Sequence, residues 1–240
     1  MHRHEDALYQ KIKIWLKDEI ASMKGGENRL DPEEKLAARF GTSRATIREA
    51  LSELAQKGYL TSWQGRGNFG HPHATALRMR FDITSDFYNL LGGAEKDVHI
   101  DQSRISLGTP SDRLIESLPI WKGEDVFHFD WIYGAGGEPL IICKVQVLSS
   151  QMKYVLEHRK NEMCLSEYLK QYHRGDIIYT TTWFHAVQDP GISVQFGVEP
   201  ETPMIMWEEF FYDLLDQQVC YNQVYFHPRE TKLSMLLRTI

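Results

Sequence analysis

The chain has 240 residues, of which 42% are hydrophobic and 25% are charged, and its formal net charge is −6 at pH 7. These values suit a globular protein of one large or two ordinary domains. No apolar run approaches the roughly 20 residues that a membrane-spanning helix needs, and the N-terminal stretch has no apolar signal core, so we expect a cytoplasmic protein with no membrane partner.

Charge is distributed unevenly along the chain. Residues 1–73 contain 12 Lys and Arg against 10 Asp and Glu, whereas residues 74–240 contain 15 against 23. Within 35–66, six basic residues stand against two acidic ones. Binding to nucleic-acid phosphate depends on local positive charge rather than on a basic protein as a whole. The pattern indicates a focused nucleic-acid contact and argues against nonspecific coating.

Two groups of potential metal ligands are weak candidates. The cysteines Cys143, Cys164 and Cys220 are far apart and lack metal-ligand spacing, which predicts reduced thiols that serve in packing. His71 and His73 are close in sequence, but a pair of histidines in a polar linker is more often solvated than metal-bound. We therefore expect no metal site and no cofactor.

Five elements are predicted in the first part of the chain. They are a helix over 6–23, a helix that begins at 32, a helix over 44–57, and strands over 59–63 and 68–71. Asp31 is placed to cap the second helix, Gly41 supplies a turn, and Ser43 is placed to cap the third helix. Residues 64–67 read Gln-Gly-Arg-Gly and predict a tight hairpin turn.

A short polar break at 71–75 precedes a different pattern. The elements predicted beyond it are helices over 82–91, 110–118, 149–158, 163–173 and 191–196, and strands over 98–107, 126–133, 140–148, 177–187, 204–214 and 219–226. Antiparallel pairs interrupted by helices predict an α+β fold. We therefore expect a first domain over 1–72, a linker over 73–83 and a second domain over 84–240.

Residues 36–69 predict a winged helix-turn-helix that reads DNA. Arg44 and Arg48 lie one turn apart near the start of the third helix, where recognition helices contact base edges. Ser43 and Thr46 offer hydroxyl groups to backbone phosphate. The alternative for this helix is that its arginines are simply solvated.

The hairpin turn predicts the tip of the wing. Gly65 and Gly67 permit the tight turn, and Arg66 between them would enter the minor groove. The alternative is an ordinary hairpin with an exposed arginine.

The motifs together resemble a known family. Residues 36–51, LAARFGTSRATIREAL, followed by Leu54, Gly58 and the 64–67 turn, resemble the N-terminal domain of GntR-family transcription regulators. The remainder resembles the effector-binding UTRA domain of the HutC subfamily, on the segments 125–129, 136–139, 196–199 and 221–226. The resemblance implies a chorismate-lyase-like antiparallel sheet, dimerisation through that domain, and binding to operator DNA that a small metabolite alters.

The chain departs from the family pattern ahead of the recognition helix. Glu34 stands where the family carries an arginine that reaches DNA. Because a carboxylate repels phosphate, one contact is expected to be lost, and Lys35 is the candidate to replace part of it. Operator affinity or operator sequence is therefore expected to differ from family habit.

A second departure concerns the effector site. The positions that the resemblance assigns to it are Thr84, Ser85, Trp131, Tyr133, Cys143 and Tyr225. Trp131, Tyr133 and Cys143 replace two arginines and a glutamate of other members, so a strongly anionic effector would lack its clamp. Aromatic side chains suit a sugar, an aromatic metabolite, or an amino-acid-like or cationic one. The alternative is that Trp131 and Tyr133 fill the core.

These observations predict a homodimeric repressor that binds double-stranded operator DNA and responds to a small-molecule effector. We expect no catalytic residues, since the sequence contains no nucleophile elbow, P-loop or HExxH motif. The alternative from another class is a small-molecule-binding or lyase-like protein whose winged helix mediates protein contacts. Convergence of Arg44, Arg48 and Arg66 favours DNA, because a protein-binding wing has no need of it.

Overall fold

The computed structural model describes residues 2–24, 26–84, 86–117, 121–154, 156 and 163–238. The chain forms two compact units, the first comprising Met1–Ile83 with Leu233–Ile240 and the second Thr84–Lys232. Over these described ranges, no helix is long and apolar enough to cross a membrane.

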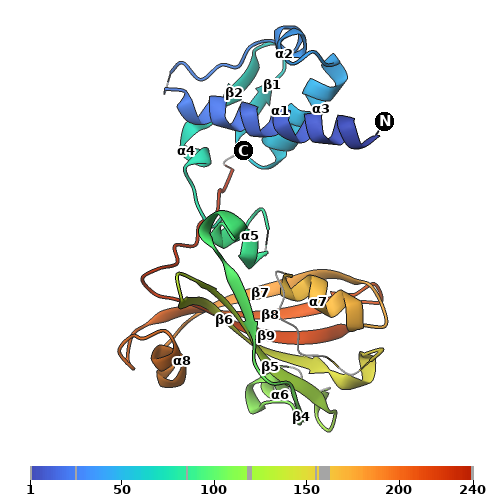
Figure 1. Ribbon diagram of the computed structural model, residues 1–240, viewed down its shortest axis with the longest axis vertical. Helices are drawn as coiled ribbons and strands as arrows, with labels where there is room; N and C mark the ends of the chain where they lie inside the picture. Colours follow the sequence, from blue (N-terminus) through green and yellow to red (C-terminus); the bar gives the residue numbers. More distant parts are fainter. Residues whose placement is uncertain are drawn as a thin grey trace. The chain divides into compact units, whose positions relative to one another are not determined.

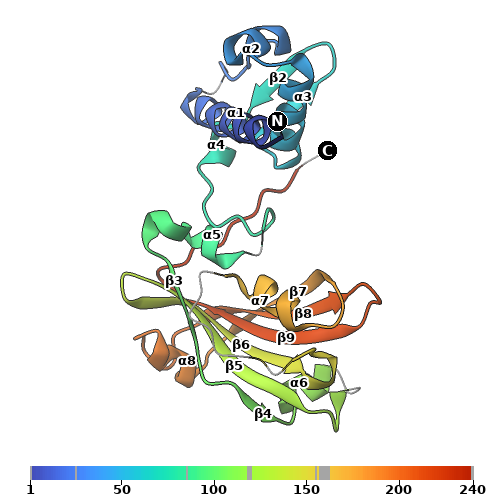
Figure 2. The same ribbon diagram turned by 45° about the vertical axis from the view of Figure 1, so that its right-hand side comes forward.

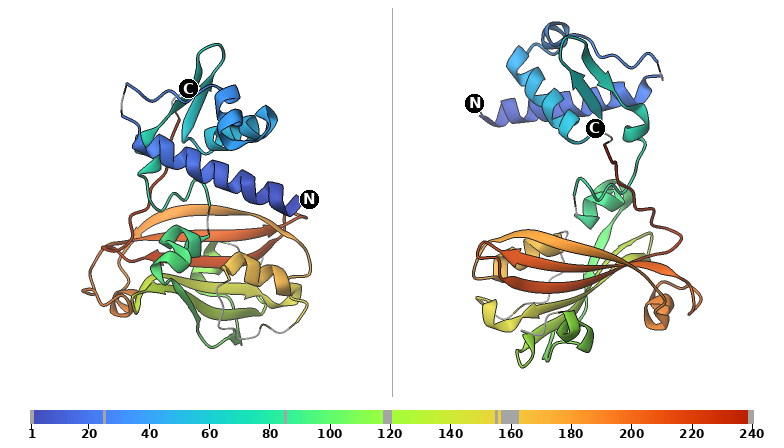
Figure 3. Two further views of the ribbon diagram at one scale, coloured as in Figure 1. Left: turned by 45° about the horizontal axis from the view of Figure 1, so that its top comes forward. Right: turned by 180° about the vertical axis from the view of Figure 1, so that it is seen from behind.

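Unit 1 consists of helices and a small hairpin (Figure 1). Its elements are α1 (His2–Ser22), α2 (Glu33–Phe40), α3 (Arg44–Gln56), β1 (Leu60–Trp63), β2 (Gly67–Gly70) and α4 (Pro72–Thr75). The hairpin of β1 and β2 is antiparallel and projects beyond the three main helices (Figure 3). This arrangement confirms the predicted winged helix-turn-helix.

The core of unit 1 forms where the apolar stripes of its helices meet. Ile12, Leu16 and Ile20 of α1 recur at helical spacing and are fully buried, and Ile47 and Leu51 of α3 pack into the same cluster. The stripe of α3 leaves Arg44 and Arg48 on its other side, in solvent. Burial of one helix face therefore determines which side chains of α3 remain exposed to solvent.

Two local predictions in unit 1 are wrong. Asp31 does not cap α2, because Pro32 occupies the N-cap position and no side chain caps that helix. The stretch at 71–75 contains a short helix, α4, whose Ala74 is buried in the core of unit 1. Burial of Ala74 and the hydrogen bonds of His71 to Gly58 and Tyr59 hold this segment on the first unit.

The C-terminal tail belongs to unit 1. Ser234 exchanges backbone hydrogen bonds with Met79 and Phe81, at 3.1 and 3.2 Å. Leu236 packs against the core of unit 1, and a Cβ on Gly58 would approach its Cδ2 to 2.8 Å. The expected domain limits assigned these residues to the second domain, whereas their contacts group them with the first.

Unit 2 is a sheet with helices on both faces (Figures 1 and 2). Its strands are β3 (His99–Gln102), β4 (Ser106–Gly108), β5 (Val126–Ala135), β6 (Glu138–Leu148), β7 (Ile177–Val187), β8 (Met204–Asp213) and β9 (Gln218–Phe226). Its helices are α5 (Phe87–Leu91), η1 (Gly93–Lys96), α6 (Asp112–Ser117), η3 (Ser149–Gln151), α7 (Leu165–Tyr172) and α8 (Pro190–Gln195).

The strands of unit 2 run antiparallel in the order β3-β5-β6-β9-β8-β7, and β4 also pairs with β5. Alternation along each strand creates two faces. Face A carries Tyr133, Cys143 and Asn222 and lies against α5 and α7. Face B carries Tyr225 and lies against α6 and α8. The α+β prediction is therefore confirmed.

Three element predictions in unit 2 differ from the structure. The strand expected over 98–107 is broken between β3 and β4, and the helix expected from 82 begins only at Phe87, where Asp86 caps it. In place of a helix over 149–158 the chain has the short η3, after which Met152 bridges His173. Residues 155, 157 and 158 lie outside the described residues.

Candidate nucleic-acid interface and ligand pocket

The N-terminal end of α3 is organised by its cap. Ser43 lies in the extended region, and its Oγ accepts a hydrogen bond of 3.1 Å from the backbone N–H of Thr46. The Thr46 hydroxyl lies 2.9 Å from the same Oγ. Capping satisfies one of the free N–H groups of the helix and fixes the direction in which α3 begins. Arg44, the first residue of α3, is oriented by this turn.

Both arginines of α3 are paired with carboxylates of α2. Arg48 makes a bidentate contact with Glu33, with Nε–Oε1 and Nη2–Oε2 distances of 3.2 and 2.7 Å. Arg44 Nη1 donates to Glu34 Oε1 at 2.7 Å. Hydrogen bonding from Arg48 lowers the pKa of the Glu33 carboxyl. All four side chains are solvent-accessible to some degree, so phosphate can compete with the carboxylates for the arginines.

Glu34 thus has a contact that sequence reasoning missed. It was expected only to repel phosphate, but it also holds the guanidinium of Arg44. The candidate replacement, Lys35, is exposed and lies 3.8 Å from Asp31, one turn earlier. Lys35 does not join the cluster formed by Glu33, Glu34, Arg44 and Arg48.

The turn of the hairpin has the geometry expected of a wing tip. Gly65 and Gly67 have φ values of 75° and 105°, which residues other than glycine rarely adopt. The guanidinium of Arg66 stacks over the ring of Trp63 at 4.7 Å from the ring centroid. This contact holds the exposed side chain of Arg66 against the hairpin.

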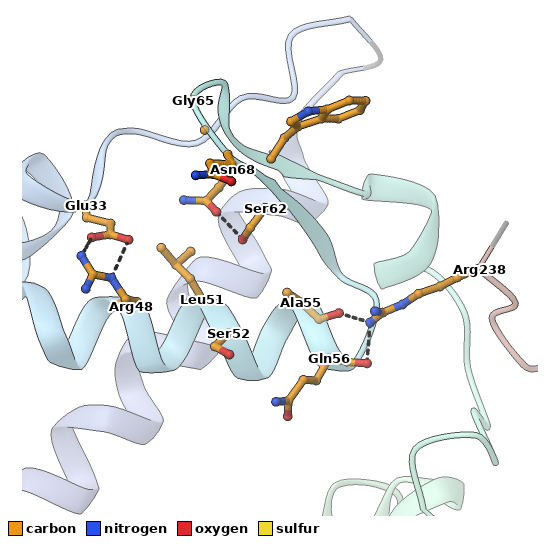
Figure 4. Close-up of a pocket in the computed structure, with 13 residues that line it drawn as sticks. Glu33, Arg48, Leu51, Ser52, Ala55, Gln56, Ser62, Gly65, Asn68 and Arg238 are labelled. Carbon is orange, nitrogen blue, oxygen red and sulfur yellow. Dashed lines mark hydrogen bonds and ion pairs between the residues drawn. The ribbon is translucent and has the colours of Figure 1, made fainter. Parts of the chain in front are cut away.

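A groove of about 670 Å³ runs between α3 and the hairpin (Figure 4). Arg48, Gly65 and Gly67 line it, so the structure brings part of the recognition helix together with the wing. Further lining residues that the sequence did not single out are Ser52, Gln56, Ser62, Gln64, Asn68 and Arg238. They add hydroxyl, amide and guanidinium groups, which are the groups that contact DNA phosphate and base edges.

Arg238 comes from the C-terminal tail. Its Nη2 donates to the backbone oxygens of Ala55 and Gln56 at the end of α3 (Figure 4). A guanidinium at this position satisfies free carbonyl groups and complements the negative end of the helix dipole. No local sequence signal could have identified Arg238, because it is more than 180 residues from its partners.

The candidate effector residues of unit 2 divide between the two faces of the sheet. Trp131 and Cys143 are paired across β5 and β6 on face A, and both are fully buried. Tyr133 is on the same face, where its hydroxyl accepts a hydrogen bond of 3.3 Å from the Leu165 N–H at the start of α7. Tyr225 is on face B, in an apolar cluster with Ile142 and other residues.

The remaining two candidates precede α5. Thr84 Oγ1 accepts a hydrogen bond of 3.0 Å from the backbone N–H of Asp86. Ser85 lies outside the described residues. The structure therefore groups three of the candidates, Trp131, Tyr133 and Cys143, on one sheet face and leaves Tyr225 on the other.

A small enclosed cavity lies on face A beneath α5 and α7. Its lining residues are Phe87, Tyr133, Cys164, Leu165, Ser166, Glu209, Phe211 and Asn222. Trp131 does not line it but packs against Phe129 and Tyr168. Trp131 thus packs among aromatic rings, whereas Tyr133 has access to the cavity.

Glu209 is the most unusual group in this cavity. It is 2% exposed, and it receives hydrogen bonds from Asn222 Nδ2, at 3.2 Å, and from the Thr180 side chain. No Lys, Arg or His of the described residues forms an ion pair with it. Burial without a neighbouring cation raises the pKa of Glu209 to about 7.

The thiols and carboxylates do not form a metal centre in the part of the chain that the structure describes. Cys143, Cys164 and Cys220 are free thiols, and burial raises the pKa of each of them. His71 is occupied by the Gly58 carbonyl, at 2.8 Å, and by the Thr61 hydroxyl. Elevated pKa values make these thiols poor nucleophiles at neutral pH.

Comparisons with known proteins agree with both units. Residues 5–69 match the family described as bacterial regulatory proteins, gntR family, and residues 94–232 match the UTRA domain. A chain of known structure, possible transcriptional regulator YydK from Bacillus subtilis subsp. subtilis str. 168, superposes with a TM-score of 0.68. It is 20% identical, and the match covers 96% of this chain and 99% of that one, which shows a common fold.

Curated relatives match over part of their length. The probable fructoselysine utilization operon transcriptional repressor of Escherichia coli (strain K12) is 33% identical over 139 residues, which are 56% of this chain and 55% of that protein. The HTH-type transcriptional regulator TreR of Bacillus subtilis (strain 168) is 28% identical over 134 residues, 53% of this chain and 55% of that protein. The matched region thus spans about half the length of these relatives. They are transcriptional regulators, not enzymes.

Proposed function

Because the chain belongs to the bacterial regulatory proteins of the gntR family that carry a UTRA domain, we propose that it represses transcription. Unit 1 binds operator DNA, and a small molecule bound by unit 2 alters that binding. The observation that carries the proposal is the groove between α3 and the wing, lined by Arg48 and by the glycines of the hairpin turn. The matched families and relatives argue against the lyase-like alternative.

In the proposed complex the first turns of α3 enter the major groove. Arg44 and Arg48 leave Glu34 and Glu33 and contact base edges or phosphate, and Ser43 and Thr46 contact phosphate. Arg66 leaves Trp63 and enters the minor groove, and Gly65 and Gly67 allow the backbone to approach DNA. Exposed ion pairs contribute little free energy, so exchanging a carboxylate for a phosphate is feasible.

The effector site is proposed to lie on face A of unit 2. Tyr133 lines the cavity there, and Trp131 and Cys143, which do not line it, are paired on the same face. Thr84 and Ser85 precede α5, which contributes Phe87 to the lining. Tyr225 lies on the other face of the sheet, so it cannot contact a ligand in this cavity. A role for Tyr225 in effector binding would require a ligand contact on face B. The chemistry of the lining suits a sugar, aromatic or amino-acid-like metabolite.

We further propose that the protein acts as a cytoplasmic homodimer that pairs through β7. This strand lies at one end of the sheet and is long, with Ile178 and Trp183 about half exposed. A long apolar edge strand is suited to pairing with a second copy. The effector then controls operator binding by population shift, since the effector and DNA favour different spacings of the winged helices of the two subunits. Sedimentation of the wild-type chain and of Trp183→Glu tests the interface.

Selection from random double-stranded DNA tests the central proposal. Immobilised wild-type protein should enrich a sequence motif, and its affinity should fall steeply as salt is raised. The matched variant is Arg48→Ala, which should bind the enriched sequence on the order of 100-fold more weakly. Lys122→Ala, a change of equal charge in unit 2, serves as the control. Failure to enrich any sequence, or equal binding by the two variants, would contradict the proposal.

A further inference from the structure

The lining of the cavity on face A includes a carboxylate and an unpartnered amide oxygen but no basic side chain. Glu209 contributes a carboxylate, and Asn222, which also lines the cavity, is fully buried with an Oδ1 that has no hydrogen-bond partner among the described residues. Lys, Arg and His are absent from the lining. An unpaired buried acceptor is costly, and a buried carboxylate without a cation is more so.

The lining and the size of the cavity further limit the chemical groups that can bind in it. Three aromatic rings line it, those of Phe87, Tyr133 and Phe211, and aromatic faces attract cations. The cavity volume of about 20 Å³ has room for a head group about the size of one water molecule. A whole sugar or aromatic ring is too large for this space, so only a small group of a larger effector can enter it, and an ammonium group is of suitable size.

An anionic head group would be repelled electrostatically in the same cavity. The start of α7 lies at the cavity, and the free N–H groups of a helix N-terminus favour anions. The Leu165 N–H, however, already donates to the Tyr133 hydroxyl, and Glu209 lines the same cavity. A carboxylate or phosphate placed here would lie against a second carboxylate without any basic side chain to compensate.

We propose that this cavity binds the ammonium head of a cationic effector, with Glu209 as the counter-charge and Asn222 Oδ1 as a hydrogen-bond acceptor. An ammonium carries donors only, which complements the Glu209 carboxylate and the unpartnered Asn222 Oδ1. The inference rests on the proposed role of unit 2 as the effector domain. It assigns the effector a chemical class, a molecule that ends in a primary amine.

Methylammonium, the smallest probe with this head group, tests the proposal. Methylammonium chloride should raise the Tm of the wild-type protein in a saturable manner, beyond the effect of potassium chloride at equal ionic strength. Methanol, a neutral molecule of similar size, and sodium acetate should give no such increase. Equal shifts by methanol would indicate a simple water-replacing cavity, and a larger shift by acetate would indicate an anion site; either result would overturn the proposal.

Glu209→Gln is the matched variant, because it removes the charge and keeps the size of the side chain. It should lose the methylammonium-specific shift, whereas Glu201→Gln, an exposed change of equal charge, should retain it. NMR of ¹³C-methylammonium with the wild-type protein gives a second measurement that needs no variant. If NMR detects no methylammonium binding to the wild-type protein, or if methylammonium raises the Tm of Glu209→Gln as much as that of wild type, the proposal is refuted.

Operator binding separates this inference from the proposed function. If wild type selects no DNA but methylammonium still binds at Glu209, the proposed function fails and the cation site stands. If DNA binding is normal and methylammonium does not bind, only the cation site fails.

Discussion

The α3 helix of unit 1 and the face A cavity of unit 2 place charged groups in opposite environments. On α3 the guanidinium groups of Arg44 and Arg48 are largely in solvent and paired with carboxylates, whereas Glu209 in unit 2 is buried without a cation. Exposed pairs exchange partners at little cost, while a buried charge depends strongly on its neighbours. The comparison teaches that DNA can take over contacts already made in unit 1, and that a ligand in unit 2 would supply a missing contact.

The largest effect is expected when the exposed cations of unit 1 are removed together. The triple variant Arg44→Ala, Arg48→Ala, Arg66→Ala should weaken binding to the selected DNA by more than about 1000-fold and flatten the salt dependence. Fluorescence anisotropy at several salt concentrations measures both. Normal binding by a folded triple variant would show that these exchangeable pairs are not the DNA contacts.

The buried carboxylate is expected to give the next largest effect, on stability. Its folded-state pKa of about 7 lies above the usual value of 4.5, so its stabilising contribution is complete below about pH 4.5 and is lost as the pH rises to about 7. The loss is on the order of 3 kcal/mol. Urea unfolding at pH 5 and pH 8 should show this decline in wild type and a smaller one in Glu209→Gln.

Glu201→Gln is the control for that measurement, since it changes the charge at an exposed site. An equal decline between pH 5 and pH 8 in wild type and Glu209→Gln would show that Glu209 is ionised in the folded protein without cost. The contrast between the two units would then disappear.

Packing of the tail on unit 1 should have a smaller effect. Leu236→Ala removes a contact with the core at Gly58 and should lower the stability of unit 1 by about 1–2 kcal/mol. Leu237→Ala is the matched control, because the neighbouring Leu237 is 79% exposed. The Tm of each variant, together with the rate of amide hydrogen exchange in α3, distinguishes the two variants. Equal Tm values for both would mean that the tail does not stabilise this unit.

The smallest effect is expected at the pair between Glu34 and Arg44. Glu34→Gln removes the shorter of the two ion pairs of Arg44, at 2.7 Å rather than the 3.9 Å to Glu33, and removes a carboxylate from the proposed DNA-binding surface, so it should tighten operator binding a few-fold at low salt. Glu95→Gln in unit 2 is the control of equal charge. Weaker binding by Glu34→Gln would mean that the carboxylate itself contacts a base, for example by accepting from a cytosine amino group.

Sequence reasoning performed best where structure depends on near neighbours. Gly41, Ser43 and the glycines of the hairpin turn act within a few residues, and the positions of α2, α3, β1 and β2 agree with those signals within a residue or two. It performed worst where two patterns compete. The run at 98–107 alternates at Val98 and Ile100, but polar residues fill 101–104 and the apolar positions resume out of phase at Ile105 and Leu107, and only the two ends of the run pair with β5.

The candidate sites show the same division. Ser43, Arg44, Thr46 and Arg48 share one helix face because of helix geometry alone, and the local pattern was sufficient to group them. Tyr225 could not be assigned to a sheet face in this way, since its face depends on the register of β9 against β6 and β8. Glu209 was missed because a glutamate in a strand carries no signal that it is buried.

By itself, the sequence determined the α+β architecture and the limits of α3 and of the hairpin, since these depend on periodicity, caps and turns over short separations, and its resemblance to a family indicated the class of the protein. Only the tertiary structure decided that Glu33 and Glu34 hold the arginines, that the tail carries Arg238 to the end of α3, and that Glu209 faces a closed aromatic cavity. These features depend on which distant side chains become neighbours, and burial then changes the free energy of every charge among them.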